Sequence, residues 1–310
     1  MLDTPFERRL LLLRRLAGVC AVLVLVVTSL SAYIRLSKAG VGCSDWPQCY
    51  GQSLRESQQG VAVSAEEQTA SAAARLVHRI AATGALLLVV MMVLVCLGAR
   101  PLLREEGALA VALLGLALFL AVLGRWSSDA RIPAVTLGNL LGGFMMVALS
   151  VRLAVAGLEL ESPRLRLWVG AALLAMIAQI ALGGLVSASF SAMSCGTLDD
   201  CLARAGQLGW GALNPWREPT LHSIPSVNPD GALANLLHRG LGLGLVIFIL
   251  PLALVLMRRG RPNSAAALFL LLIAQAAIGL EMLQGGLPMN FALLHNLLAA
   301  TLLAALVLIL

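Results

Sequence analysis

The chain has 310 residues, of which 59% are hydrophobic and only 12% are charged, whereas about a quarter of the residues in a soluble domain are charged. Its mean hydropathy is +0.90, so we expect most of the chain to lie in lipid. The net charge of +6 comes from short arginine clusters between apolar runs. That pattern orients membrane helices, and it excludes nucleic-acid binding as the explanation of the charge.

Eight apolar segments each approach the length of about 20 residues that a helix needs to cross the hydrocarbon. The first is too long for the core of a signal peptide and no clear cleavage site follows it, so we expect it to remain as the first span. The sequence therefore predicts an all-α, polytopic membrane protein with eight transmembrane helices. The segments lie near residues 12–34, 74–98, 107–124, 133–156, 166–188, 233–257, 264–284 and 289–310.

Arginine clusters precede the first span, follow the second and the sixth, and flank the loop between the fourth and the fifth. All four fall on one side if both termini are cytoplasmic. The two long loops, roughly 35–73 and 189–232, are then expected outside a bacterial-type inner membrane. The clustered residues are Arg8, Arg9, Arg14, Arg15, Arg100, Arg104, Arg152, Arg164, Arg166, Arg258, Arg259 and Arg261.

The chain repeats itself once. The second span opens "LVHRIAATGALLLVV" and the sixth opens "LLHRGLGLGLVIFIL", while the fourth contains "TLGNLLGGFMMVAL" and the eighth "LLHNLLAATLLAAL". Because each copy has an even number of spans, both copies enter the membrane from the same side. We expect two parallel four-helix halves related by a pseudo-twofold axis, residues 1–160 and 161–310.

Each copy also carries two cysteines with the same spacing on the expected outer side, Cys43 with Cys49 and Cys195 with Cys201. Thiols in an oxidising compartment form disulfides, so each pair is expected to close a small loop. A metal site remains the alternative, although no histidine or third cysteine lies nearby in the sequence.

Three histidines lie inside predicted spans: His78, His238 and His295. A histidine in a membrane helix is costly and indicates function, although a hydrogen bond to a neighbouring helix is the alternative. His238 and His295 lie at similar depths on what we expect to be neighbouring helices, so their imidazoles could bind one haem iron from opposite faces. Zinc would need more protein ligands than these two. His222, in a polar loop, receives no role.

Polar residues near these histidines suggest further contacts. Arg79 and Arg239 each follow a histidine, and either could pair with a haem propionate or extend to the lipid headgroups. Gln179 and Gln275 lie in equivalent spans and are expected to hydrogen-bond across the bundle.

Tryptophans mark the expected outer side. Trp46 and Trp126 are expected to anchor the chain at the lipid–water interface. Trp210 and Trp216 are expected to pack the second long loop over the mouth of the bundle.

The motifs together resemble those of the haem A synthase family, eight-helix proteins that convert haem O to haem A for cytochrome oxidase assembly. The resemblance rests on "RLSKAGVGCSDWPQCYG", "LVHR", "ALGGLVSASF", "LLHRGLG" and "LLHN" and covers essentially the whole chain. It implies a haem b between His238 and His295 in the C-terminal half. It also implies that haem O binds in the N-terminal half through His78, where its C8 methyl group is oxidised.

The chain departs from the family pattern at two positions in the N-terminal half. The family has a second histidine on the fourth span, where this chain has Gly138 or Asn139, depending on the alignment. The family also has a glutamate three residues before the histidine of the second span, where this chain has Arg75. With His78 alone the iron of haem O would have an open face, and Asn139 is expected to hydrogen-bond a haem substituent or a water.

Three functions follow as hypotheses. The first is a haem A synthase-like oxidoreductase, with haem b as cofactor, haem O as substrate, haem O synthase as the upstream partner implied by the family, and a separate electron donor. The second is a non-catalytic haem-binding assembly protein that keeps only the C-terminal haem. The third is a transporter, suggested by the two-copy architecture. A homo-oligomer in the lipid bilayer is compatible with each.

Overall fold

The computed structural model describes residues 4–60, 72–127, 131–157, 162–221 and 223–310. Within these ranges the chain is helical without strands, and eight helices are long and apolar enough to cross a membrane. They are α1 (Pro5–Lys38), α4 (Ala72–Leu97), α5 (Arg104–Ser127), α6 (Pro133–Ala154), α7 (Pro163–Ala188), α9 (Ala232–Arg258), α10 (Pro262–Gln284) and α11 (Met289–Val307). The predicted spans are confirmed.

Local sequence explains where several helices begin. Thr4 and Glu7 form a capping box at the start of α1, in which each side chain bonds the other's backbone N–H at 3.2 Å. Proline stands in the first turn of α1, α6, α7 and α10, where its missing N–H costs no intrahelical hydrogen bond.

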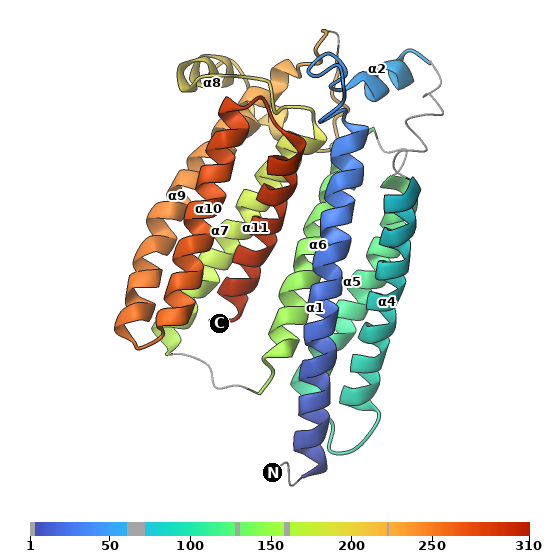
Figure 1. The fold of residues 1–310 in the computed structure, drawn as a ribbon, viewed down its shortest axis with the longest axis vertical. Helices are drawn as coiled ribbons and strands as arrows, with labels where there is room; N and C mark the ends of the chain where they lie inside the picture. The colour runs from blue at the N-terminus through green and yellow to red at the C-terminus, as the bar shows by residue number, and fades with distance from the viewer. Residues whose placement is uncertain (1–3, 61–71, 128–130, 158–161, 222) are drawn as a thin grey trace.

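The eight spans form two four-helix halves that stand side by side (Figure 1). In the N-terminal half α1 and α5 each pack on α4 and α6, and in the C-terminal half α7 and α10 each pack on α9 and α11. The halves meet through α6 with α11, α1 with α11, and α6 with α7. This pattern maps onto itself when the halves are exchanged, so the predicted pseudo-twofold arrangement is confirmed. The expected division at residue 160 falls in 158–161, outside the described residues.

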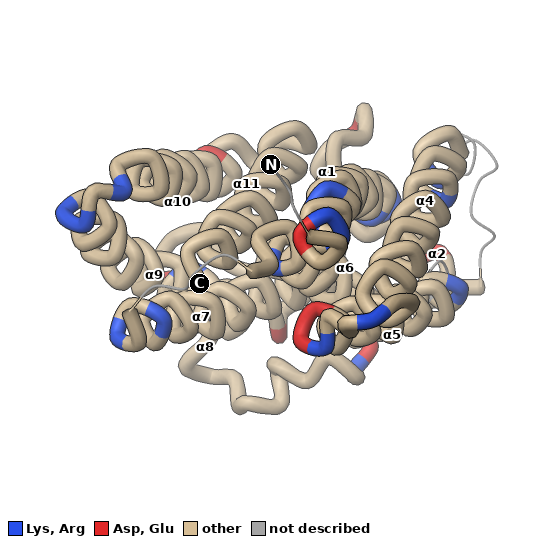
Figure 2. Tube along the Cα trace, turned by 90° about the horizontal axis from the view of Figure 1, so that it is seen from below, with Lys and Arg blue, Asp and Glu red and all other residues tan. Residues whose placement is uncertain are grey.

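Arginines hold helix ends at the end of the bundle where the N-terminus lies. Arg9 donates to the carbonyls of Val95, Cys96 and Pro101 at 2.6–3.2 Å, and Arg14 donates to the carbonyl of Ala156 at 2.7 Å. Val95 and Cys96 lie in the last turn of α4, whose final carbonyls have no intrahelical partner, and Ala156 follows the end of α6. Figure 2, which views the molecule from this end, shows basic residues at several helix tips.

The opposite end carries both cysteine loops together with the short helices α2 (Gln52–Gln58) and α8 (Leu198–Ala205) (Figure 1). The two short 3-10 helices, Trp210–Leu213 and Pro229–Gly231, lie in the second long loop. This loop reaches the N-terminal half. The Ala134 N–H donates to the carbonyl of Pro215 at 2.8 Å, and Gln58 donates to the carbonyl of Pro219 at 3.0 Å.

Candidate functional site

His238 of α9 and His295 of α11 face each other inside the C-terminal half. Their ring centroids are 6.4 Å apart and their ring planes are inclined by 73°. The two helices are not the neighbours that we expected. Each packs on α7 and α10, so the two imidazoles meet diagonally across the half.

The His238 ring is held by α7 on two sides. Its Nδ1 lies 3.2 Å from the carbonyl oxygen of Gln179, and because a carbonyl only accepts, Nδ1 carries the proton. The Gln179 side-chain amide donates to the backbone carbonyl of His238 at 3.0 Å. One turn further along α7 lies Gly183, where a Cβ would stand only 2.7 Å from Cε1 of His238. The ring therefore needs glycine at position 183.

The His295 ring is held in a similar way by α10. The Gln275 side-chain nitrogen lies 3.1 Å from Nε2 of His295, and a Cβ on Gly279 would lie 3.3 Å from its Cε1. Gln275 precedes Gly279 by four residues, as Gln179 precedes Gly183. The predicted hydrogen bonds of both glutamines across the bundle are thus present, and both reach a histidine.

Several buried polar atoms in this region have no hydrogen-bond partner among the described residues. They include Nδ1 of His295 and the side-chain oxygens of Gln179 and Gln275. A buried unpaired polar group is costly, so such a cluster marks a place where a bound group or solvent completes the structure.

The distance between the two rings fits a shared metal. A metal–imidazole bond of about 2 Å plus about 1 Å from the nitrogen to the ring centroid places two rings on opposite sides of one metal about 6 Å apart. The described residues hold no group of three or more His, Cys, Asp or Glu side chains suited to a metal ion. A metal between His238 and His295 would therefore have to bring further ligands with it, as the iron of a haem does.

Arg239 contacts the second cysteine loop. Its guanidinium donates to the carbonyl of Cys195 at 3.2 Å, to that of Gly196 at 3.4 Å, and lies 3.2 Å from Sγ of Cys201. The Cys195 and Cys201 sulfurs are at bonding distance, 2.04 Å. Arg239 thus ties this disulfide loop to the helical turn that carries His238.

Residues before His238 fix the start of α9. The buried Asn235 donates to the carbonyl of Ser191 at 2.5 Å, and the buried Asn228 donates to the carbonyl of Ser189 at 2.8 Å. Ser194 donates to the carbonyl of Asn228 at 2.7 Å. These bonds join the end of α7 to the start of α9 close to the histidine.

The first cysteine loop covers the other half of the molecule. Cys43 and Cys49 are also at bonding distance, and residues of their loop form an apolar cluster with the ends of α10 and α11 that lie opposite the N-terminus of the chain. This cluster, which we name the roof cluster, contains Leu36, Ala39, Val41, Trp46, Tyr50, Phe190, Ala192, Met193, Met282, Leu287, Met289, Ala292 and Leu293. A segment of the N-terminal half therefore lies over the C-terminal half.

Aromatic rings form the centre of the roof cluster. Tyr50 lies between Trp46 and Phe190, with ring centroids 5.5 Å and 5.7 Å apart, and its burial raises the pKa of its hydroxyl, which stays protonated. Trp46 is partly buried against this cluster, and its role as an anchor at the lipid surface stays a prediction. Trp126 is exposed at the end of α5, as an interface anchor would be.

The second loop also differs from expectation. Trp210 and Trp216 are 77% and 71% exposed, so they do not pack the loop over the bundle.

In α8, Arg204 donates to Asp200 at 2.6 Å, and this hydrogen bond lowers the pKa of the Asp200 carboxyl. His222 lies outside the described residues.

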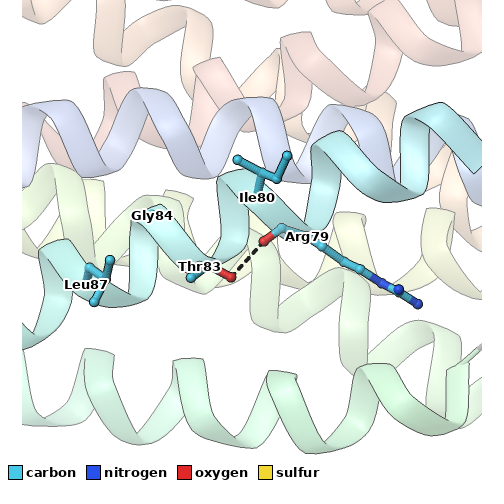
Figure 3. Close-up of a pocket in the computed structure, with 5 residues that line it drawn as sticks. All are labelled: Arg79, Ile80, Thr83, Gly84 and Leu87. Atoms are coloured by element: carbon cyan, nitrogen blue, oxygen red, sulfur yellow. Dashed lines mark hydrogen bonds between the residues drawn. The ribbon is translucent and has the colours of Figure 1, made fainter.

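The N-terminal half has no matching pair of histidines. His78 is half-buried on α4, and the next residue, Arg79, is exposed. Figure 3 shows Arg79 directed along the outside of α4, beside a shallow hollow of about 420 Å³ lined also by Ile80, Thr83, Gly84 and Leu87. Arg79 therefore lies on the outer surface of its helix.

Leucines fill the space beside the matching stretch of α6. A Cβ on Gly138 would lie 3.2 Å from Leu123, and a Cβ on Gly142 would collide with Leu120. Asn139 is partly buried. Where α10 presents Gln275 and Gly279 to His295, α5 thus presents leucines to the corresponding helix.

The two glycines that seat the histidines were missed at the sequence level. A signal was present, since "AQIALG" at 178–183 and "AQAAIG" at 274–279 share the same spacing of alanine, glutamine and glycine. Small residues are so frequent in membrane helices that this repeat did not stand out.

The fold defines a class: multi-span helical membrane proteins, here with two histidines that face each other inside one half of the bundle. Residues 14–307 match the model of the family described as cytochrome oxidase assembly protein, so the chain belongs to this family. A relative is the heme A synthase of Shewanella oneidensis, 30% identical over 201 residues. The match covers 60% of this chain and 60% of the relative, so the chain aligns with only about three fifths of that protein's length.

Proposed function

We propose that the chain is a haem A synthase-like oxidoreductase, which oxidises the C8 methyl group of haem O to the formyl group of haem A for cytochrome oxidase assembly. The observation that carries the proposal is the pair His238 and His295, with ring centroids 6.4 Å apart. Family membership and the name of the relative support the same direction.

In this proposal His238 and His295 are the residues that would hold haem b, through their imidazole nitrogens. Bound haem b supplies one-electron redox chemistry. The chain orients the rings through α7 and α10, and the roof cluster limits the access of water. Arg239 has five N–H donors, so beyond its bonds to the cysteine loop it can receive a propionate. Arg79 is exposed on α4, so extension to the lipid headgroups suits it better than the propionate contact first expected of it.

The N-terminal half receives haem O as the substrate. His78 would bind its iron from one side, and α6 provides no second histidine for the other. Asn139 supplies a hydrogen bond to a substituent of the ring. The first disulfide loop, Cys43–Cys49, serves haem transfer or structural integrity.

The proposal includes a location and partners. The end with the arginine-capped helices faces the cytoplasm, with both termini, and the cysteine loops face outward from a bacterial-type inner membrane. Haem O synthase supplies the substrate, and a separate electron donor is required. Association into a homo-oligomer is compatible with this arrangement.

A second candidate function is a non-catalytic haem-binding protein of oxidase assembly. One observation favours it: Leu120 and Leu123 fill the space next to Gly142 and Gly138, where a second ligand would stand. Arg75 in place of a glutamate also removes a group for proton transfer from the methyl carbon.

Pigment analysis tests both candidates. The chain, purified from cells that make haem O, is expected to be red with a low-spin spectrum that His238→Ala or His295→Ala abolishes. Haem A or hydroxylated haem O, identified by mass in the extract, is expected for the wild type and not for His78→Ala. A red protein without either product would establish the second candidate, and a colourless protein would reject both.

A further inference from the structure

Arg79 and Arg239 follow the histidines of equivalent helices, yet their guanidinium groups have different surroundings. Arg239 donates to the carbonyls of Cys195 and Gly196, in the disulfide loop of its own half. The corresponding loop of the N-terminal half packs instead in the roof cluster, against α10 and α11. Among the described residues, no hydrogen bond or ion pair reaches the Arg79 guanidinium. The repeated arginine therefore has a protein partner in one half and none within the described part of the other.

The position of Arg79 on α4 makes an unpaired charge costly. Its Cα lies about 10 Å along the axis from Ala72, the first residue of this membrane helix, and a charge at such depth needs an anion or water to pair with. The side chain is exposed, and Figure 3 shows it directed away from Leu87, toward the end at which α4 begins. A long arginine stem reaches the lipid headgroups in this way. The anion that pairs with Arg79 is thus expected among the headgroups.

The hollow beside Arg79 is apolar apart from this one cation. It has a volume of about 420 Å³ and is lined by Ile80, Thr83, Gly84 and Leu87, with no acidic side chain. The Thr83 hydroxyl donates to the carbonyl of Arg79 at 2.9 Å, so its O–H is used within the helix. The lining extends for about 12 Å along α4. A cation at one end of an apolar hollow is complementary to an amphiphile with an anionic head and a hydrocarbon chain.

We propose that Arg79 and this hollow form a binding site for one anionic phospholipid. The Arg79 guanidinium donates hydrogen bonds to the phosphate, and an acyl chain lies along Ile80, Gly84 and Leu87. Gly84 leaves room for the chain because it has no side chain. The site is separate from the histidine pair and goes beyond the proposed function, since binding of lipid requires no haem.

Lipid retention by the purified full-length chain tests the site. The chain in a non-ionic detergent is mixed with equal amounts of phosphatidylglycerol and phosphatidylcholine, and native mass spectrometry identifies the lipid that remains bound after gel filtration. The wild type is expected to retain phosphatidylglycerol in preference. Arg79→Gln is expected to retain roughly tenfold less of it, because charge-assisted hydrogen bonds are lost.

Two further variants complete the test. Arg125→Gln is the matched control, because Arg125 is also an exposed arginine of a membrane helix but does not line the hollow, and its retention is expected to equal that of the wild type. Thr83→Phe keeps the charge and narrows the hollow, so it is expected to lower retention as well.

Several outcomes would overturn the proposal. They are equal retention of the two lipids by the wild type, and equal retention of phosphatidylglycerol by Arg79→Gln and Arg125→Gln. Release of the bound lipid by haem O would assign the hollow to that substrate, and a dimer that Arg79→Gln abolishes would assign it to a second copy of the chain. Should Arg79→Gln not fold, equal retention by Thr83→Phe and the wild type would overturn the proposal. None of these results depends on conversion of haem O, so the proposed function is tested separately.

Discussion

The two halves of the molecule have the same helix arrangement, but they place different side chains at equivalent positions. In the C-terminal half, α10 offers Gln275 and Gly279 to His295. In the N-terminal half, α5 offers Leu120 and Leu123 to the matching stretch of α6. Both halves keep four helices with the same packing partners.

This difference teaches that the helix frame does not depend on the contents of the site. Apolar clusters hold each half together: one runs through α1, α4, α5 and α6, and the other through α7, α9, α10 and α11. The residues that face the histidines can therefore change without loss of the bundle. What does change is the free space, since an imidazole requires a glycine opposite it and a leucine excludes it.

Replacing the glycine that faces the His238 ring should have the largest effect on haem binding in the C-terminal half. In Gly183→Ala the new Cβ would lie 2.7 Å from Cε1 of His238, so the ring must leave its position. We expect haem occupancy to fall roughly tenfold or more, measured as Soret absorbance per protein. Gly170→Ala, on the same helix with nothing within 4 Å of its Cβ, should keep full occupancy; equal loss in both variants would contradict this explanation.

Removing His78 should separate the halves functionally. His78→Ala is expected to abolish conversion of haem O while the low-spin spectrum of the C-terminal site stays unchanged, because α4 and α9 belong to different halves. Absorbance spectra and pigment extraction on the same sample measure both properties. Loss of the low-spin spectrum in this variant would show that the halves do not load independently.

Opening the second cysteine loop should reduce stability moderately. Cys195→Ser with Cys201→Ser removes a short closed loop, for which chain entropy predicts a loss of about 2 kcal/mol. Thermal unfolding in detergent measures it. Because Arg239 bonds the loop at Cys195 and Cys201, faster haem loss is expected as well, and to a greater extent than in Cys43→Ser with Cys49→Ser. Equal haem loss in the two double variants would show that the contact of Arg239 with the second cysteine loop does not affect haem binding.

Truncating the exposed tryptophans should have the smallest effect. Trp210→Ala and Trp216→Ala remove side chains that are 77% and 71% exposed, so the free energy of unfolding is expected to change by less than about 0.5 kcal/mol. A thermal shift assay measures it. A large loss in either variant would mean that these rings pack against another surface in the membrane.

Hydropathy was sufficient to predict the eight spans, because the length of a membrane helix is set by the bilayer. The similar depths of His238 and His295 in their spans also predicted that these two rings meet. The sequence did not predict that these rings meet diagonally, because the order of the four helices around the bundle depends on packing between spans, which hydropathy does not specify. The contact of Trp46 with the roof cluster could not be predicted either, since it depends on the opposite half.

The roof cluster has a consequence for how this duplicated chain can be divided. Tyr50 and Val41 come from the first copy, yet they pack with Ala292, three residues before a histidine of the second copy. If the gene were cut between the copies, the C-terminal half would keep His238 and His295 but would lose the roof-cluster residues that the N-terminal half supplies. The two copies are thus interlocked, and neither can evolve as an autonomous module while this overlap is kept.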